Sequence, residues 1–597
     1  MPKSLEQQPY IWLEQPYVPR HISSTSFEPQ PRTSPAVLVK RVRNAKSLLS
    51  CAALLLSFTV QRSIFTFGPT AKHIALKQMA RKGSRKCDGY AVAKPRSDLS
   101  WHRPRQLFPG ISNSAEGRAL QFFCEVAGPL LPGATDPYFW THVVMQFSNF
   151  EPAVRHAVVA ISSLYERHQS DQRPGVISSS DGFALQHYNA AIRELRTTEN
   201  QPLVLLVCVL FICIEFLQSN KESAIIHCKH GINVLGQVTS TYPWTREHLV
   251  PIFRRLSLIP FFFAKRASDL PSLAGLDEPF SEVFDTFEEA RTMIDVIMSR
   301  AMQLVRWGDE YRLGGLRHTS VSPNLLEEQE LIGRLLDRWH ASFTKFAVKM
   351  AVPASPVAQR IKLEQQYVQQ MSTAFLSISY ETGMIWRHIA FACNETEYDD
   401  YMDGYRRVVE QALAIAPASP DFVCMVPSRP KFIFEMGFTP LLYFVVVKCR
   451  DLETRLLALR FMQSLGVPRE SLWDVNTTYA LGRRIIEVEH GVTLDNRGHL
   501  LTPADFPGLP PEHLRVRGTW TEGGPSKERH IDGNKVVGKM IGFYLLNTDD
   551  STYLQTEFLP DDLDAARLVG FNQTNVFALA NFESATSSTP TSLTLAS

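Results

Sequence analysis

Histidine and cysteine are the side chains of this 597-residue chain whose spacing could hold a metal ion. His227 and His230 lie three residues apart around Cys228, so a helix would place both imidazoles on one face. The alternative, which we favour, is that Cys228 lies in a helical core with the two histidines at its polar edge. No Cys-x-x-Cys pair occurs among the nine cysteines, whose odd number and apolar surroundings indicate buried free thiols in a reducing compartment.

No other group of polar residues has the spacing of a catalytic site. We interpret His142 and His156 as packing or surface residues. Glu487 and Glu489 fall on different faces of one predicted helix and are expected at its solvated edge. The signatures G-x-x-x-x-G-K-[ST], G-x-G-x-x-G, H-E-x-x-H and G-x-S-x-G do not occur. The sequence therefore predicts no catalytic residue; an enzyme with an all-α body is the alternative class.

The elements that would position these side chains are predominantly helical. Ser114 can cap a first helix, and the Pro-Gly turn at 129–133 ends it. Proline at 152 begins another helix, because its fixed φ suits the first helical position. Apolar residues between 154 and 165 then recur with the helical period of 3.6 residues. This pattern predicts a packed helical domain.

Further helices are expected over much of the chain up to residue 500. The run Pro202–Leu217 is apolar almost throughout and reads as a central helix buried on all sides, in spite of Glu215. Trp140 and Trp473 are expected as core anchors. Other helical candidates are 183–196, 222–235, 285–306, 327–349, 360–393, 405–415 and 453–465. The segment 440–449 is apolar almost throughout and is expected in the core. From about residue 502 the sequence becomes rich in proline and glycine. The segments 513–521 and 536–547 are expected to be either two strands or irregular segments that pack around the helical body.

Three stretches carry a resemblance to a known family. The first is EPAVRHAVVAISSLYE at Glu151–Glu166, which follows Trp140, and the others lie within Ala184–Leu235 and Phe438–Glu489. In their residues, their order and their approximate spacing, these stretches resemble the middle domain of fungal Zn(II)2Cys6 binuclear zinc-cluster transcription factors. The resemblance implies a nuclear, sequence-specific regulator of RNA polymerase II transcription that binds promoter DNA. Members often govern nutrient use or a specialised-metabolite gene cluster, and their middle domain is the regulatory part.

The segment RKGSRKCDGY at Arg81–Tyr90 resembles the end of that family's zinc cluster. Such a cluster uses six thiolates to hold two zinc ions, and the metal supplies the folding energy of a very small domain. Here only Cys87 matches, at the sixth ligand position, because the preceding pair would fall near Lys77 and Ala80. The candidate metal ligand is therefore Cys87 alone. The candidate DNA phosphate contacts are the basic residues around it, Arg81, Lys82, Arg85 and Lys86.

This departure leaves two interpretations of the N-terminal region. Either the first exon assigned to the gene is wrong and the true product has a complete zinc cluster, or the chain has lost its DNA-binding head. A headless chain would act by pairing with an intact relative, or would be a decayed copy. A homodimer is the other partner considered, although 91–113 contains three prolines and no heptads that would form a dimerising coiled coil.

The charge distribution fits either a DNA-binding arm on an acidic body or a disordered basic tail that binds no ligand. Residues 1–113 contain 18 Lys and Arg against 5 Asp and Glu, a net charge of +13, whereas the remainder carries −11. No secretory signal is visible, and the apolar run 48–60 is short for a membrane span, so no membrane partner is predicted.

The expected fold is mainly α, in six parts. An atypical, disordered N-terminus covers 1–80, the cluster remnant 81–90 and a linker 91–113. The helical regulatory domain covers 114–500, the C-terminal extension 501–583 and a disordered, Ser/Thr-rich tail 584–597.

Overall fold

The computed structural model places the described residues in the unit that begins at Pro104. Apart from a few single positions, the described residues are 110–170, 179–238, 242–263, 280–350, 359–416, 430–522, 526–531, 534–547, 552–561 and 575–578. The predicted N-terminus 1–80, the cluster remnant 81–90, nearly all of the linker and the tail 584–597 lie outside the described residues, so their predictions stay untested.

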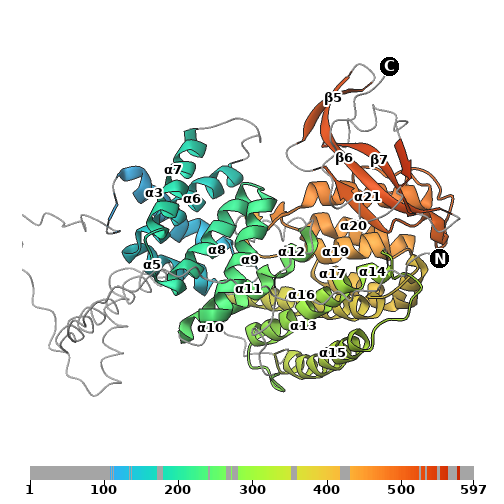
Figure 1. Ribbon diagram of the computed structural model, residues 1–597, viewed down its shortest axis with the longest axis horizontal. Coiled ribbons are helices and arrows are strands. Elements are labelled where there is room, and N and C mark those ends of the chain that lie inside the picture. Colours follow the sequence, from blue (N-terminus) through green and yellow to red (C-terminus); the bar gives the residue numbers. More distant parts are fainter. Residues whose placement is uncertain are drawn as a thin grey trace, which may run out of the picture. The chain divides into compact units, whose positions relative to one another are not determined.

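Helices make up most of the described chain, which confirms the mainly-α fold (Figure 1). The first half contains α3 (Ser114–Phe122), η1 (Phe123–Ala127), α4 (Gly128–Leu130), η2 (Phe139–Val143), α5 (Val144–Phe150), α6 (Pro152–Gln169), α7 (Ser179–Leu195), α8 (Gln201–Leu217), α9 (Lys221–Val238), α10 (Pro243–His248), α11 (Val250–Leu256) and α12 (Leu258–Phe263). The second half contains α13 (Phe287–Trp307), α14 (Asp309–Arg312), α15 (Pro323–Met350), α16 (Gln359–Ile389), η4 (Glu395–Tyr401), α17 (Met402–Ile415), α19 (Phe438–Lys448), α20 (Leu452–Leu465), α21 (Val475–His490) and η5 (Glu512–Leu514).

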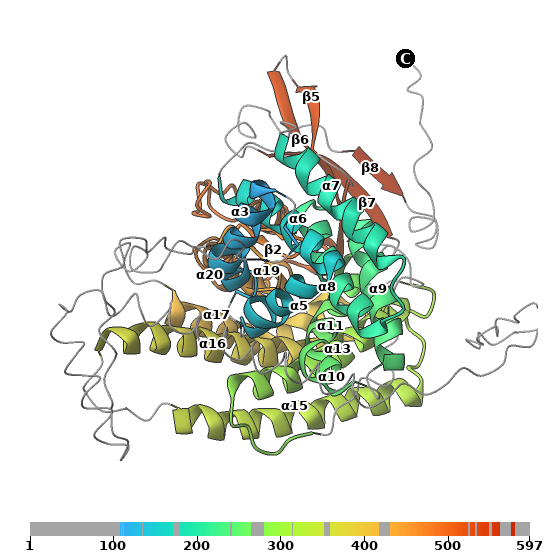
Figure 2. The ribbon, with the colours of Figure 1, turned by 90° about the vertical axis from the view of Figure 1, so that its left-hand side faces the viewer.

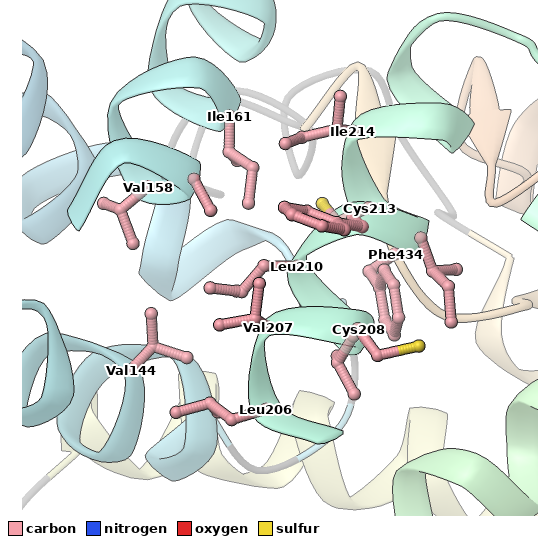
Figure 3. Close-up of a cluster of buried hydrophobic side chains, with 14 of the residues drawn as sticks. Val144, Val158, Ile161, Leu206, Val207, Cys208, Leu210, Cys213, Ile214 and Phe434 are labelled. Atoms are coloured by element: carbon pink, nitrogen blue, oxygen red, sulfur yellow. The ribbon is translucent and has the colours of Figure 1, made fainter. Parts of the chain in front are cut away.

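The first hydrophobic core surrounds α8, which is buried on nearly every face, as its continuous apolar sequence predicts. Figure 3 shows Val158 and Ile161 of α6 and Val144 of α5 beside the side chains of α8. Glu215 is the acidic residue within α8, and its Oε1 accepts a hydrogen bond of 2.6 Å from the Tyr188 hydroxyl. In the described part of the chain no helix is long and apolar enough to cross a membrane.

The second core lies among α13, α15, α16, α17, α19, α20 and α21. The long helices α15 and α16 run side by side along one edge of this group (Figures 1 and 2). Trp339 of α15 is fully buried, and its indole N–H donates to the Ala290 carbonyl of α13 at 2.8 Å. Met436 packs against both cores, so the segment before α19 joins the two halves.

Two small sheets accompany the helices. Strands β1 (Phe432–Ile433) and β2 (Arg469–Glu470) pair in parallel, and β3 (Trp473–Asp474) pairs antiparallel with β2. The larger sheet is antiparallel, with β6 (Asn534–Leu546) between β7 (Thr552–Pro560) on one side and both β4 (Gly518–Thr521) and β5 (Lys527–Ile531) on the other. β8 (Asn575–Ala578) pairs with β7.

The larger sheet lies in the predicted C-terminal extension and packs against the helical body. Phe543 and Ile541 of β6 share a small core with Val447 of α19 and Ile485 of α21. Of the two alternatives left open for 513–521 and 536–547, strands are therefore confirmed at β4 and β6.

Local signals explain several of the helix ends. Pro152 begins α6, as predicted, and Gly491 ends α21 in the left-handed region with φ of +63°. The predicted cap of the first helix is wrong by one residue. Asn113 precedes α3, and its side-chain oxygen accepts from the Glu116 N–H at 3.0 Å. Both residue types cap well, so sequence alone does not separate them.

The central position of α8 predicts a large cost for truncating one of its side chains. We expect Leu210→Ala, at a fully buried position, to lower the free energy of unfolding by about 2–5 kcal/mol because it leaves a cavity. Leu413→Ala in α17 is the matched control, since that side chain is 60% exposed. Chemical denaturation measures both, and equal losses would contradict this account of the first core.

Candidate functional site

A cavity lies where the two hydrophobic cores meet. Its walls come from α11, α12, α13, α16, the segment 434–437 and the start of α19. Much of the wall is apolar, with aromatic rings contributed by Phe262, Phe375, Trp386 and Phe434. The cavity volume is about 50 Å³, which is room for several water molecules or a compact organic group.

Four charged side chains form the polar end of this cavity. Arg255 of α11 donates two hydrogen bonds to the carboxylate of Glu435, from Nε at 2.8 Å and from Nη2 at 3.1 Å. Asp295 of α13 lies between the two arginines, with its Oδ2 3.8 Å from Arg255 Nη1 and 3.8 Å from Arg291 Nε. The Arg291 guanidinium also lies over the ring of Phe375, at 4.7 Å from the ring centroid.

Three atoms of this group are buried and make no hydrogen bond within the described chain. They are Arg255 Nη1, Arg291 Nε and Asp295 Oδ2. Burial raises the pKa of Asp295 to about 6, although the two arginines oppose the rise. Burial alone would lower the pKa of Arg255, but the carboxylates of Glu435, Asp295 and Glu288 outweigh it and raise that pKa. The site therefore contains two positively charged guanidinium groups, of Arg255 and Arg291, beside the Asp295 carboxyl, whose ionised form is destabilised by burial.

Glu470 fixes the segment that carries Glu435 into the cavity wall. Its Oε2 accepts hydrogen bonds of 3.0 Å from the N–H groups of both Gly437 and Thr439, and its Oε1 accepts from Val467 at 2.9 Å. A Cβ at position 437 would lie 2.9 Å from the Glu470 carboxylate, so a larger residue there would displace that carboxylate from its hydrogen bonds. The carboxylate thus satisfies the free N–H groups at the start of α19.

A second charged group is buried beneath the larger sheet, and it corrects the prediction for Glu487 and Glu489. Both were expected at a solvated edge, but they are 6% and 0% exposed. Glu489 accepts from Arg455 Nη1 at 2.7 Å and lies 3.4 Å from Arg450 Nη2. The prediction is wrong because the buried partners come from α20 and the end of α19, which the period of α21 alone does not reveal.

This group, which we call the ionic centre (Glu395, Lys448, Arg450, Arg455 and Glu489), connects four segments of the body. Glu395 accepts from Lys448 Nζ at 2.8 Å and from Arg450 Nη2 at 2.8 Å. Burial lowers the pKa of Lys448 to about 8, in spite of Glu395. Burial alone would raise the pKa of Glu489, but the two arginines and a backbone N–H outweigh it and lower that pKa.

Contacts from the ionic centre and its neighbours hold the C-terminal extension. The N–H of Val516 donates to Glu489 Oε1 at 2.7 Å, and Lys448 Nζ donates to the Arg517 carbonyl at 3.0 Å. Arg515 makes a bidentate pair with Asp399 of η4, with both distances 2.8 Å. Arg484 of α21 similarly binds Glu557 of β7, at 2.7 and 3.1 Å. The extension is therefore attached by charged contacts as well as by the apolar core.

The histidines considered as candidates do not form a metal site. Within the described part of the chain, no group of three or more His, Cys, Asp and Glu side chains could hold a metal ion. Cys228 is fully buried, as the alternative interpretation predicted, and His227 packs edge-on against Phe211. His142 stacks on Tyr138, whereas His156 Nδ1 lies 2.9 Å from His187 Nδ1. Trp140 is a core anchor as predicted, and Trp473 is partly buried.

The candidate ligand and DNA contacts of the cluster remnant, Cys87, Arg81, Lys82, Arg85 and Lys86, lie outside the described residues. None of the described residues that line the cavity was a predicted site residue. Of the residues at its polar end, the sequence analysis had singled out none, because the four charges come from three separate segments that only the fold brings together.

Comparison with known proteins finds a distant similarity to one fungal regulator. The chain is 22% identical over 537 residues to the aspercryptin biosynthesis cluster-specific transcription regulator of Emericella nidulans. The match covers 74% of this chain and 84% of that protein. No model of a protein family matches the chain. No solved structure matches it. The similarity supports a role in fungal transcription regulation in general terms.

Asp295 gives the polar end of the cavity a predictable pH dependence. A carboxyl whose pKa is higher in the folded state binds a proton on folding, so its contribution to stability falls as the pH rises from about 4 to about 6. The variant Asp295→Asn has no carboxyl to titrate at this position, so its stability should not fall with pH for this reason. We expect the free energy of unfolding to shift in favour of this variant by up to about 3 kcal/mol between pH 4 and 7. Chemical denaturation across pH measures the shift.

Asp403→Asn, at an exposed position in α17, controls for the loss of one carboxyl. A difference between Asp295→Asn and the wild type that does not change with pH would contradict the assigned burial of Asp295.

The ionic centre predicts a strong effect of removing one charge. Glu489→Gln leaves Arg450 and Arg455 without their shared carboxylate, so we expect a loss of about 3–5 kcal/mol in unfolding free energy near neutral pH. Because the pKa of Glu489 is lowered, this loss should shrink as the pH falls below about 4.5. Glu410→Gln, at an exposed position in α17, is the control in the same denaturation assay. Equal stability of the two variants would show that the ionic centre is not a major contributor.

Proposed function

We propose that this chain is a nuclear regulator of transcription by RNA polymerase II in a fungus, and that it acts on genes of specialised metabolism or nutrient use. The observation that carries the proposal is the similarity to a cluster-specific transcription regulator, which extends over 74% of the chain. The mainly-α body is compatible with the regulatory domain that the sequence resemblance implies. We assign no catalytic role to the chain.

In this proposal the basic residues Arg81, Lys82, Arg85 and Lys86 contact DNA phosphates at promoters, and Cys87 is the sixth ligand of a zinc cluster. One thiolate cannot hold two zinc ions, so zinc belongs to the proposal only if the mature protein has five further cysteines at family spacing. Reading the transcript from its 5′ end through the first splice junctions decides whether these cysteines are encoded.

A second candidate is a regulator that reaches promoters through a partner protein. It is favoured by Lys77 and Ala80, which stand near the places where the resemblance expects a pair of cysteines. The partner would be an intact zinc-cluster relative. Both candidates predict the same effect on transcripts and differ only in which chain contacts DNA.

Transcript profiling after gene deletion tests the proposed function. Deletion should change the transcripts of a limited gene set, and reintroduction of the full gene should restore them. Unchanged transcripts under the conditions in which the gene is expressed would overturn the proposal.

The phosphate contacts are testable by the salt dependence of binding. We expect replacement of Arg81, Lys82, Arg85 and Lys86 by alanine to reduce the slope of log affinity against log salt by about 0.9 per lost contact on a mixed-sequence duplex. Replacement of Lys40, Arg41, Arg43 and Lys46 removes the same charge elsewhere in the basic arm and is the matched control. Equal slopes for both variants would contradict a specific role of the remnant.

A further inference from the structure

The cavity between the two cores has unused hydrogen-bonding groups at one end. Arg255 Nη1 and Arg291 Nε are donors, Asp295 Oδ2 is an acceptor, and all three are buried without a hydrogen-bond partner in the described chain. Both donors lie 3.8 Å from the same acceptor, which is too long for a direct hydrogen bond. Arg255 is only 9% exposed, so water outside the protein does not readily satisfy it. Buried polar atoms in this state are costly unless something binds them.

The charges around these atoms indicate what kind of group would bind. Arg255 and Arg291 carry two positive charges. Glu435, Asp295 and the partly exposed Glu288, whose Oε1 lies 3.6 Å from Arg255 Nη1, can carry three negative charges, so the two arginines have counter-charges without a ligand. An added carboxylate would leave an excess negative charge beside Asp295, and an added ammonium would face two arginines. An uncharged hydroxyl fits both needs, because its hydrogen can be donated to Asp295 Oδ2 while its oxygen accepts from an arginine N–H.

The rest of the wall indicates the body of the ligand. Phe262, Phe375, Trp386 and Phe434 surround an apolar space, together with Met298 and Leu441. Small-molecule sites in proteins commonly combine such a wall with a few convergent polar groups. A planar or compact apolar body would contact these rings, with its hydroxyl at the arginine end.

We propose that this cavity is a binding site for a small, uncharged organic molecule with an apolar, ring-containing body and a hydroxyl group. Such a molecule would join α11, α13, α16 and the segment before α19, which belong to both cores. Its role as an effector of transcription rests on the proposed function above, whereas the binding itself does not. If gene deletion leaves transcripts unchanged, the proposed function fails, but the proposed binding of a small molecule does not.

Phenol is the probe, and toluene is the matched compound of similar size that lacks the hydroxyl. Binding to the purified full chain is measured by saturation-transfer NMR titration at pH 7, with benzoate as the charged analogue. We expect phenol to saturate a single site and to bind at least tenfold more tightly than either toluene or benzoate.

Two variants locate the site. Ser379→Leu places a larger side chain in the cavity wall and should abolish phenol binding, whereas Ser377→Leu makes the same change on α16 at a residue that does not line the cavity. Asp295→Asn keeps the shape of the side chain but weakens the acceptor, and should lower phenol affinity several-fold. Circular dichroism establishes that each variant is folded.

The proposal is overturned if phenol does not bind the folded wild type, or if phenol and toluene bind equally well. It is also overturned if folded Ser379→Leu binds phenol as the wild type does, because the phenol site would then lie elsewhere. If Ser379→Leu does not fold, Asp295→Asn takes its place, and unchanged phenol affinity in that variant overturns the role of the polar end.

Discussion

The burial of Glu489 between Arg450 and Arg455 is the interaction on which the join between the helical body and the C-terminal sheet depends. A carboxylate at a fully buried position is tolerated only when charges and hydrogen-bond donors surround it. Here the donors include the backbone N–H of Val516, immediately before the sheet. Because the same carboxylate serves α20, the end of α19 and the start of the extension, these segments are expected to form and unfold together.

The buried Asp295 carboxyl at the cavity also needs nearby hydrogen-bond donors, but its Oδ2 has none within hydrogen-bond distance. At the ionic centre every buried carboxylate has close donors, whereas Asp295 lies 3.8 Å from each of its two arginines. Glu470 holds the segment that carries Glu435, because its carboxylate accepts hydrogen bonds from the N–H groups of Gly437 and Thr439. In the binding proposal, a small molecule in this cavity would contact elements of both cores.

Periodicity in the sequence predicted most of the helices, because each needs only local information. The central helix α8 and the helix α20 were found within a few residues of their ends. The two clusters of buried charge were not predicted, since Arg255 and Glu435 are 180 residues apart in sequence. The hairpin of β5 and β6 had a usable signal in the dipeptide Asp532-Gly533, which favours tight turns between strands. The partners of Glu489 had no such signal, because a glutamate at a helix edge has the same pattern whether or not another helix covers it.

The central claim is that this chain regulates transcription, and chromatin immunoprecipitation of the tagged full chain with sequencing tests it most directly. The account predicts enrichment at the promoters of a limited gene set, whether the chain contacts DNA itself or through a partner, because cross-linking captures both. Uniform recovery of the genome, equal to that of an untagged strain, would contradict the account.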